Sequence, residues 1–162
     1  MKIVEYDDKY LNDVKDLLVE LEEYIISIDK DNLDQLSADY RDYMAKIDLN
    51  NVKKNNGKCY LAIENNKAIG LIMGCIYPYD KYDYLDYKCP KRGEIIELIV
   101  SKKVRSKGVG KSLMLKMEEY FKQQGCEYIK IEVFAYNENA VDFYNKGGYH
   151  VRMHTEIKKI SD

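Results

Sequence analysis

The chain has 162 residues, of which 46% are hydrophobic, and its formal net charge is −2. This length and composition predict one globular domain over 1–162 and exclude a disordered chain. The charge argues against nucleic-acid binding, and no apolar stretch is long enough to span a bilayer. No signal peptide or C-x-x-C pair is present, so we expect a cytoplasmic protein with reduced thiols and no metal site.

The N-terminal third predicts one strand followed by two helices. After a strand over 1–6, apolar residues recur at helical spacing over 8–26, with Asp7 or Asp8 as the N-cap. A second helix is expected over 33–54. The apolar residues expected on its inner face are Leu33, Leu36, Tyr40, Met44 and Ile47.

A hairpin and an unusual loop follow. Strands are expected over 59–64 and 67–77, because Asn65–Asn66 between them tolerates the positive φ of a tight turn. Tyrosine and aspartate then alternate over 77–90. Such side chains suit a cationic amine, so this loop is either a cover for an acceptor site or a surface excursion or subunit contact.

The second half alternates strands and helices. Its predicted elements are a strand over 94–101, a helix from 109 to 124, a strand over 127–134, a helix over 138–146 and a last strand over 148–159. Gly125 is the expected C-cap of the first of these helices. The complete order is βααβββαβαβ, and periodicity alone indicates an α/β (α+β) fold with one central sheet.

The junction between the strand at 94–101 and the next helix has the features of a phosphate site. Gly108 and Gly110 let the backbone turn sharply and approach a ligand. The first amides of the helix have no intrahelical acceptor, and the helix dipole favours negative charge. Six lysines and arginines and no acids fall between 102 and 116. The sequence therefore predicts a polyanionic ligand.

Gly110-Lys111-Ser112 also resembles the end of a nucleotide-binding P-loop. That motif requires a glycine where this chain has Arg105. The P-loop backbone wraps around a phosphate, and so large a side chain would obstruct it. A P-loop enzyme also needs a later strand that ends in a magnesium-binding aspartate, whereas the strand over 127–134 leads into Ala135-Tyr136. The P-loop hydrolase is the weaker alternative.

Two motifs together resemble the GNAT N-acetyltransferase superfamily. Arg105-Ser106-Lys107-Gly108-Val109-Gly110 is similar to the acetyl-CoA pyrophosphate loop of that family. Downstream, the block 137–149 (Asn-Glu-Asn-Ala-Val-Asp-Phe-Tyr-Asn-Lys-Gly-Gly-Tyr) is similar to its Asn-x-x-Ala-x-x-Phe-Tyr signature. The resemblance implies a mixed, mostly antiparallel sheet flanked by helices, in which the strands at 94–101 and 127–134 splay apart.

The resemblance also implies acetyl-CoA as co-substrate and a set of cofactor-binding residues. The backbone of the strand end would pair with the pantetheine arm, and an N–H near Ile99 or Val100 would polarise the thioester carbonyl. The loop amides and side chains would hold the phosphates. The implied cofactor residues are Leu98, Ile99, Val100, Arg105, Ser106, Lys107, Gly108, Val109, Gly110, Lys111, Ser112, Asn137 and Tyr144.

Two residues are the candidate catalytic groups. Tyr144 falls on the family position of the acid that protonates departing coenzyme A, with a core tyrosine as the alternative. Glu97 is an acid inside an apolar strand, which is costly unless it is paired, hydrated or functional, so it is the candidate general base. A structural Glu97 is the alternative, and Glu94 and Glu132 are weaker candidates. Strand alternation puts Glu97 on the side of Ile95 and Ile99.

These observations indicate an acetyl-CoA-dependent N-acetyltransferase that acts by direct attack of a primary amine. Eleven acids against three lysines between Glu5 and Asp34 favour a small cationic acceptor, unless they form only a solvated face. A protein or peptide amine is an alternative acceptor. A coenzyme A-binding sensor or structural subunit without turnover is the alternative from another class. Dimers are common among similar proteins, and the sequence leaves a homodimer open.

Overall fold

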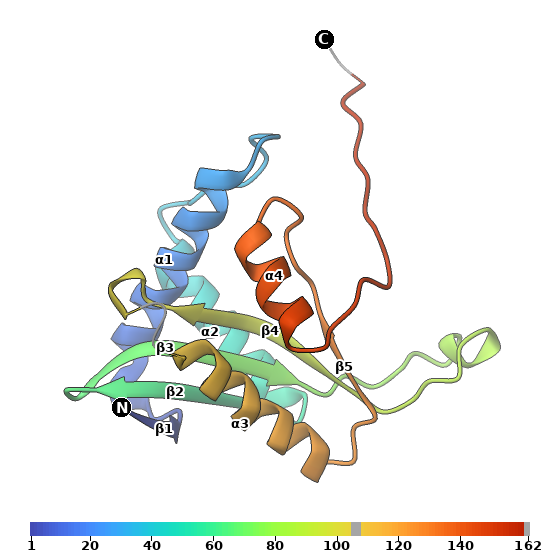
Figure 1. Ribbon diagram of the computed structural model, residues 1–162, viewed down its shortest axis with the longest axis horizontal. Coiled ribbons are helices and arrows are strands. Elements are labelled where there is room, and N and C mark those ends of the chain that lie inside the picture. The colour runs from blue at the N-terminus through green and yellow to red at the C-terminus, as the bar shows by residue number, and fades with distance from the viewer. Residues whose placement is uncertain (105–107, 161–162) are drawn as a thin grey trace. The chain divides into compact units, whose positions relative to one another are not determined.

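The computed structural model describes residues 1–104 and 108–160, drawn in Figure 1. Contacts divide the chain into two compact units, Met1–Glu132 and Val133–Asp162. The first unit holds a sheet and three α-helices, and the second holds one α-helix. Each unit is treated by itself below.

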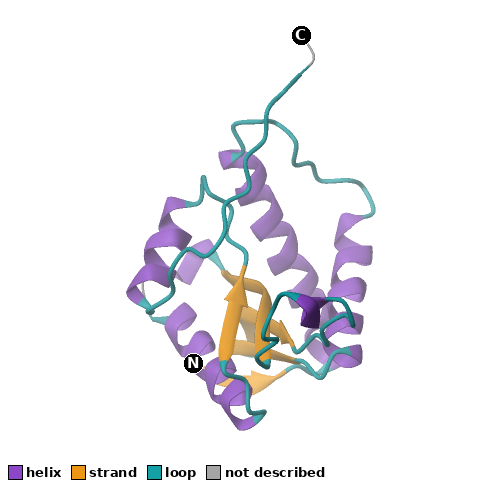
Figure 2. Cartoon of the chain, turned by 90° about the vertical axis from the view of Figure 1, so that its right-hand side faces the viewer, coloured by secondary structure: helices purple, strands orange, loops and turns teal. Residues whose placement is uncertain are grey.

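The first unit is a five-stranded sheet in the order β1-β2-β3-β4-β5. Neighbouring strands are antiparallel except for β4 and β5, which are parallel. The strands are β1 (Lys2–Glu5), β2 (Lys58–Glu64), β3 (Lys67–Cys75), β4 (Arg92–Val100) and β5 (Tyr128–Ile131). The α-helices are α1 (Leu11–Ile28), α2 (Tyr40–Lys54) and α3 (Val109–Gln123). Figure 2 shows these strands between helices.

The sheet buries one face under α1 and α2 and the other under α3. The first face forms the main core, in which Val14, Leu17 and Leu18 of α1 pack with Ala45 of α2 and with alternate strand residues. The second face is tight against α3, because a Cβ built on Gly93 would lie 2.5 Å from the ring of Phe121. β3 is apolar almost throughout, because its successive side chains point alternately to the two covered faces.

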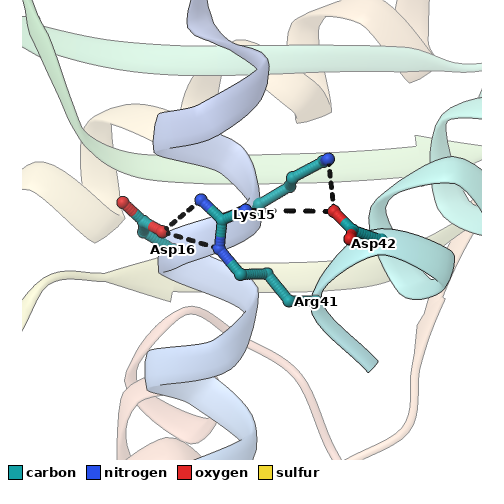
Figure 3. Close-up of polar contacts among 4 residues, drawn as sticks. All are labelled: Lys15, Asp16, Arg41 and Asp42. Atoms are coloured by element: carbon teal, nitrogen blue, oxygen red, sulfur yellow. Dashed lines mark hydrogen bonds and ion pairs between the residues drawn. The ribbon is translucent and has the colours of Figure 1, made fainter. Parts of the chain in front are cut away.

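Ion pairs join α1 to α2 at their exposed surface, as Figure 3 shows. Lys15 Nζ lies 2.6 Å from a carboxylate oxygen of Asp42, and Arg41 lies 2.8 Å from Asp16. Such exposed pairs contribute little stability, roughly 0–1 kcal/mol each.

The fold class expected from the sequence is confirmed: a mostly antiparallel sheet is flanked by helices, and the elements follow the predicted order as far as the last helix. The local signals also hold. The Asp7 side chain accepts a hydrogen bond from the Lys9 amide and caps the first helical turn. Asn65 and Asn66 have φ values of 51° and 59°, as their tight turn requires, and Gly125 has a φ of 74° after α3.

Two expectations are wrong. The second helix begins at Tyr40 rather than at residue 33, and its inner face differs, because Ile47 is 49% exposed while the next residue, Asp48, is buried. The last strand, expected over 148–159, is not formed: residues 149–160 have no secondary structure and are mostly exposed. Apolar alternation there is insufficient, since a strand also needs a partner edge for its backbone hydrogen bonds.

Candidate functional site

The predicted phosphate loop lies between β4 and α3. A short 3-10 turn over Lys102–Val104 follows the strand. Of the predicted cofactor residues, Arg105, Ser106 and Lys107 lie outside the described residues. Gly108 precedes α3 with a φ of 75° and a ψ of 8°. This left-handed conformation is the turn that the glycine was expected to provide.

The first turn of α3 presents backbone rather than apolar side chains to the loop. Val109 is buried against the sheet, so only its amide is available to an anion. The Ser112 amide and hydroxyl both donate to the carbonyl of Gly108, which fixes the turn. Lys111 is exposed and Gly110 is part of the helix. The amides of Val109 to Lys111 head the helix, where no intrahelical acceptor exists. This end of α3 therefore suits negative charge.

The second half of β4 has a strand on one side only within the described residues. The ladder between β4 and β5 ends at Ile95, paired with Ile131. On the other side, β3 pairs with β4 as far as Val100. Within the described residues of the first unit, no strand pairs with the edge of Glu97 to Ile99 that faces away from β3, which agrees with the splay expected of these strands.

A β-bulge interrupts β4 beside this open edge. Met73 of β3 pairs with Glu97, but the preceding pair is Gly74 with Ile95, so Ile96 has no paired residue in β3. Paired residues share a face of a sheet. Met73 lies in the core under α1 and α2, whereas Gly74 faces α3. The bulge thus places Ile95 and Glu97 on opposite faces.

Simple alternation predicted that Glu97 shares a face with both Ile95 and Ile99. This is right for Ile99, which pairs with Leu71 in the same core, and wrong for Ile95. The extra residue of a bulge shifts the two-residue period by one, so every side chain before it changes face. As a result, Glu97 turns toward α1 and α2.

Glu97 has an acidic environment. Its pKa is raised to about 8, first by burial, then by the charge of Asp48 on α2 and that of Glu22 on α1. The hydroxyl of Tyr40 donates to Glu22 Oε2 at 3.3 Å. A carboxyl group with a pKa near neutral can take a proton from an amine more readily than an ordinary glutamate.

Asp48 is the site residue that sequence reasoning missed. It is 4% exposed, and burial raises its pKa to about 6. The apolar pattern of α2 favoured Ile47 as the inward residue, because an isolated aspartate in a helix normally faces solvent. The available signal was the position of Asp48 three residues after Ala45 and four before Val52, which are both on the core face.

Several acids of the N-terminal segment have structural partners. Asp13 accepts a hydrogen bond from the Ala68 amide at 2.9 Å, and Asp16 pairs with Arg41. Glu20 accepts hydrogen bonds from the Ser101 hydroxyl and the Lys102 amide, which ties α1 to the start of the phosphate loop. The acidic character of this segment is thus partly structural.

The second unit carries the other two predicted site residues, one at the start of α4 and one within it. Asn137 caps α4 (Glu138–Lys146) by accepting a hydrogen bond from the Ala140 amide at 3.2 Å. Tyr144, on the same helix, is 9% exposed, and its ring lies 5.2 Å from that of Phe143 and 5.7 Å from that of Tyr149. Tyr144 is thus held by aromatic packing.

The tyrosine rings of the segment over 77–90 pack against one another. The Tyr79 hydroxyl donates to the Pro90 carbonyl at 2.8 Å and closes the base of the loop. The Tyr79 ring contacts Tyr84 and Tyr87, and the Arg92 guanidinium lies 4.8 Å from its centroid. Tyr79 therefore already has a cation of this chain at its face.

The chain resembles known acetyltransferases. The family model described as "Acetyltransferase (GNAT) family" matches residues 23–149. An uncharacterized N-acetyltransferase of Methanocaldococcus jannaschii is 33% identical over 94 residues, 57% of this chain and 53% of its own. An N-alpha-acetyltransferase of Arabidopsis thaliana is 28% identical over 94 residues, 56% of this chain and 44% of its own. The match thus spans about half the length of these curated relatives.

The same fold occurs in an aminoglycoside N-acetyltransferase solved in complex with coenzyme A. That structure has a TM-score of 0.69 and 13% identity, with 99% of this chain and 100% of that chain covered. Within the described residues, no helix is both long and apolar enough to cross a membrane. In the same part of the chain, no three histidine, cysteine or acidic side chains are grouped to hold a metal ion.

Proposed function

Because this chain belongs to the acetyltransferase (GNAT) family, we propose that it transfers the acetyl group of acetyl-CoA to the primary amine of a small cationic acceptor. Two features of the chain support this most directly. The left-handed Gly108 turn heads α3 and suits an anion, and Glu97 of the preceding strand points into an acidic environment. The transfer needs a site for the phosphates of the cofactor and a base for the amine, and these two features are the candidates.

In the proposed reaction, each group of this chain has one task. The amides of Val109 to Lys111 hold the pyrophosphate, and the backbone of Leu98 to Val100 pairs with the pantetheine arm. An amide near Ile99 or Val100 polarises the thioester carbonyl. Arg105, Ser106, Lys107, Ser112 and Asn137 complete the proposed cofactor contacts.

The bond changes are those of a direct acyl transfer. Glu97 takes a proton from the acceptor amine, whose nitrogen attacks the thioester carbon. The C–N bond forms and the C–S bond breaks, and the departing thiolate takes a proton, in this proposal from Tyr144. The four cysteines are free, which fits a reducing compartment such as the cytoplasm.

The experiment that tests this proposal is calorimetric titration with acetyl-CoA, with ATP–magnesium as the control. A panel of amines, including a peptide N-terminus, is then followed by thiol release. We expect acetyl-CoA to bind and cationic small amines to release thiol. Binding without release on any amine would support the sensor alternative, and preferential binding of ATP would overturn the phosphate-loop assignment.

Gly108→Val is expected to weaken acetyl-CoA binding at least 10-fold while the protein stays folded. A β-branched residue at a φ of 75° is strained by about 1–2 kcal/mol and distorts the turn that aims the helix amides. The matched control is Gly125→Val, at the other end of α3 with a φ of 74°. It should cost similar stability and leave affinity unchanged. Equal loss of affinity in both variants would contradict the assignment.

Tyr144→Phe is expected to lower turnover about 100-fold and to change acetyl-CoA affinity less than 3-fold, because the variant removes a proton donor and keeps the ring. Single-turnover thiol release measures the effect. Tyr149→Phe, which removes a hydroxyl from the neighbouring ring of the same unit, is the control. An unchanged rate in Tyr144→Phe would remove this residue from the proposed chemistry.

A further inference from the structure

Asp48 carries an unusual buried charge. Its side chain is 96% removed from solvent, and its Oδ2 atom has no hydrogen-bond partner within the described residues. Burying an ionised carboxylate without a partner costs far more than burying a neutral group of the same shape. A polar atom left in this state in a native fold requires an explanation beyond packing.

Two more carboxyl groups belong to the same environment. Glu97 of β4 pairs with Met73, which lies in the core under α1 and α2, and the charges of Asp48 and Glu22 both act on it. Glu22 of α1 also accepts a hydrogen bond from Tyr40 of α2. No ion pair joins any of these three to a lysine, arginine or histidine of the described residues. The negative charge of these three carboxyl groups is therefore available to a cation from outside the chain.

We propose that Asp48 is a positioning residue of the acceptor site, whose carboxylate supplies a negative charge that draws a cationic aliphatic amine toward Glu97. This inference rests on the proposed function and narrows its acceptor to an amine that arrives as an ammonium ion. Glu97 is the group that contacts the amine, and Asp48 acts through Glu97.

The proton transfer that follows is balanced. The ammonium gives one proton to the Glu97 carboxylate, which leaves a neutral amine and a neutral Glu97 carboxyl. The amine nitrogen then has the free electron pair that attack on the thioester needs. While Asp48 is ionised, Glu97 holds that proton more firmly, because protonation of Glu97 removes the repulsion between two negative charges.

The titratable groups around Asp48 and Glu97 form two sets. One favours the neutral form of Glu97, and the other has pKa values that burial and the charge of Asp48 raise. Glu22 adds its charge to that of Asp48 at Glu97. Burial, and to a smaller extent the charge of Asp48, raises the pKa of four further groups from α2, β2, β3 and the segment after β3, which are Tyr40, Cys59, Cys75 and Tyr77. No basic group of the described residues opposes these effects at Asp48 or Glu97.

The direct test is a carbon-13 NMR titration of the side-chain carboxyls in the unliganded protein. In Asp48→Asn, which keeps the shape and removes the charge, the titration midpoint of Glu97 should fall by about one pH unit. Asp39→Asn, an exposed acid just before α2, should leave it unchanged. An unchanged midpoint in folded Asp48→Asn would overturn the proposal.

A second variant keeps the test decisive if Asp48→Asn does not fold. In the wild type, the Asp48 resonance should show a second step at the midpoint of Glu97, and this step should vanish in Glu97→Gln. A single-step Asp48 titration in the wild type would mean that the two carboxyls do not interact, which contradicts the proposal.

Kinetics separates this inference from the proposed function. Asp48→Asn should raise the KM of a straight-chain alkylamine about 10-fold and leave acetyl-CoA affinity unchanged, whereas Asp39→Asn changes neither. If the wild type binds no acetyl-CoA, the proposed function fails. If the wild type acetylates amines and Asp48→Asn matches it in KM and in Glu97 midpoint, the function stands and the role of Asp48 fails.

Discussion

Glu97→Gln is expected to lower kcat/KM for the amine about 100-fold at pH 7, because an amide has the shape of the carboxyl but cannot take a proton. The pKa of about 8 at Glu97 also predicts the pH dependence. The deficit should be largest at and below pH 8 and should shrink as the pH rises toward the pKa of the acceptor, where free amine no longer needs a base.

The matched control lies on the same strand. Glu94 pairs with Lys130 at 3.3 Å, so its carboxyl is already engaged, and Glu94→Gln should change the rate less than 3-fold. Pre-steady-state thiol release across pH 6 to 10 measures both variants. A loss in Glu97→Gln that is equal at every pH would indicate that Glu97 only positions the acceptor.

Stability is expected to fall as the pH rises from about 5 to 9. Folding raises the pKa of Asp48 from 3.8 to about 6 and that of Glu97 from 4.5 to about 8. The folded state therefore prefers the protonated acids. Their contribution is complete below the unfolded pKa values and is lost as the pH passes about 6 and then about 8. At about 1.4 kcal/mol per pKa unit, the two acids together cost several kcal/mol at pH 9.

Urea unfolding at intervals from pH 5 to 9 checks this expectation. Glu97→Gln and Asp48→Asn should each flatten the dependence, and Glu97→Gln should be more stable than the wild type at pH 9. Glu94→Gln should keep the wild-type slope. A free energy of unfolding that rises over this range would show that the two acids are not buried in the folded protein as described.

Local sequence signals predicted most of the elements and their ends, because local interactions determine them. Asn65 and Asn66 accept positive φ, Gly108 and Gly125 bound α3, and Asn137 caps α4, each for reasons that lie within a few residues. The family resemblance implied that the strands at 94–101 and 127–134 splay apart, and the ladder between β4 and β5 ends at Ile95.

The acidic site could not be predicted, because it depends on contacts between distant segments. The bulge at Ile96 exists only in the pairing of β3 with β4, and it decides which way Glu97 points. Asp48 is buried because α2 begins at Tyr40 and packs on α1 at one particular rotation. The sequence between 33 and 39 has helical spacing, but the structure shows no helix there.

The hydrogen bonds from Ser101 and Lys102 to Glu20 have a consequence for the order in which ligands bind. Through them, α1, which borders the proposed acceptor side, is hydrogen-bonded to the segment where the phosphate loop begins. A ligand that shifts α1 must shift this loop or break the contact. By thermodynamic linkage the effect is reciprocal. If one ligand changes the affinity for the other by some factor, the second ligand changes the affinity for the first by the same factor. In the proposed reaction, the carboxylate of Glu20 would therefore couple the binding of the two substrates.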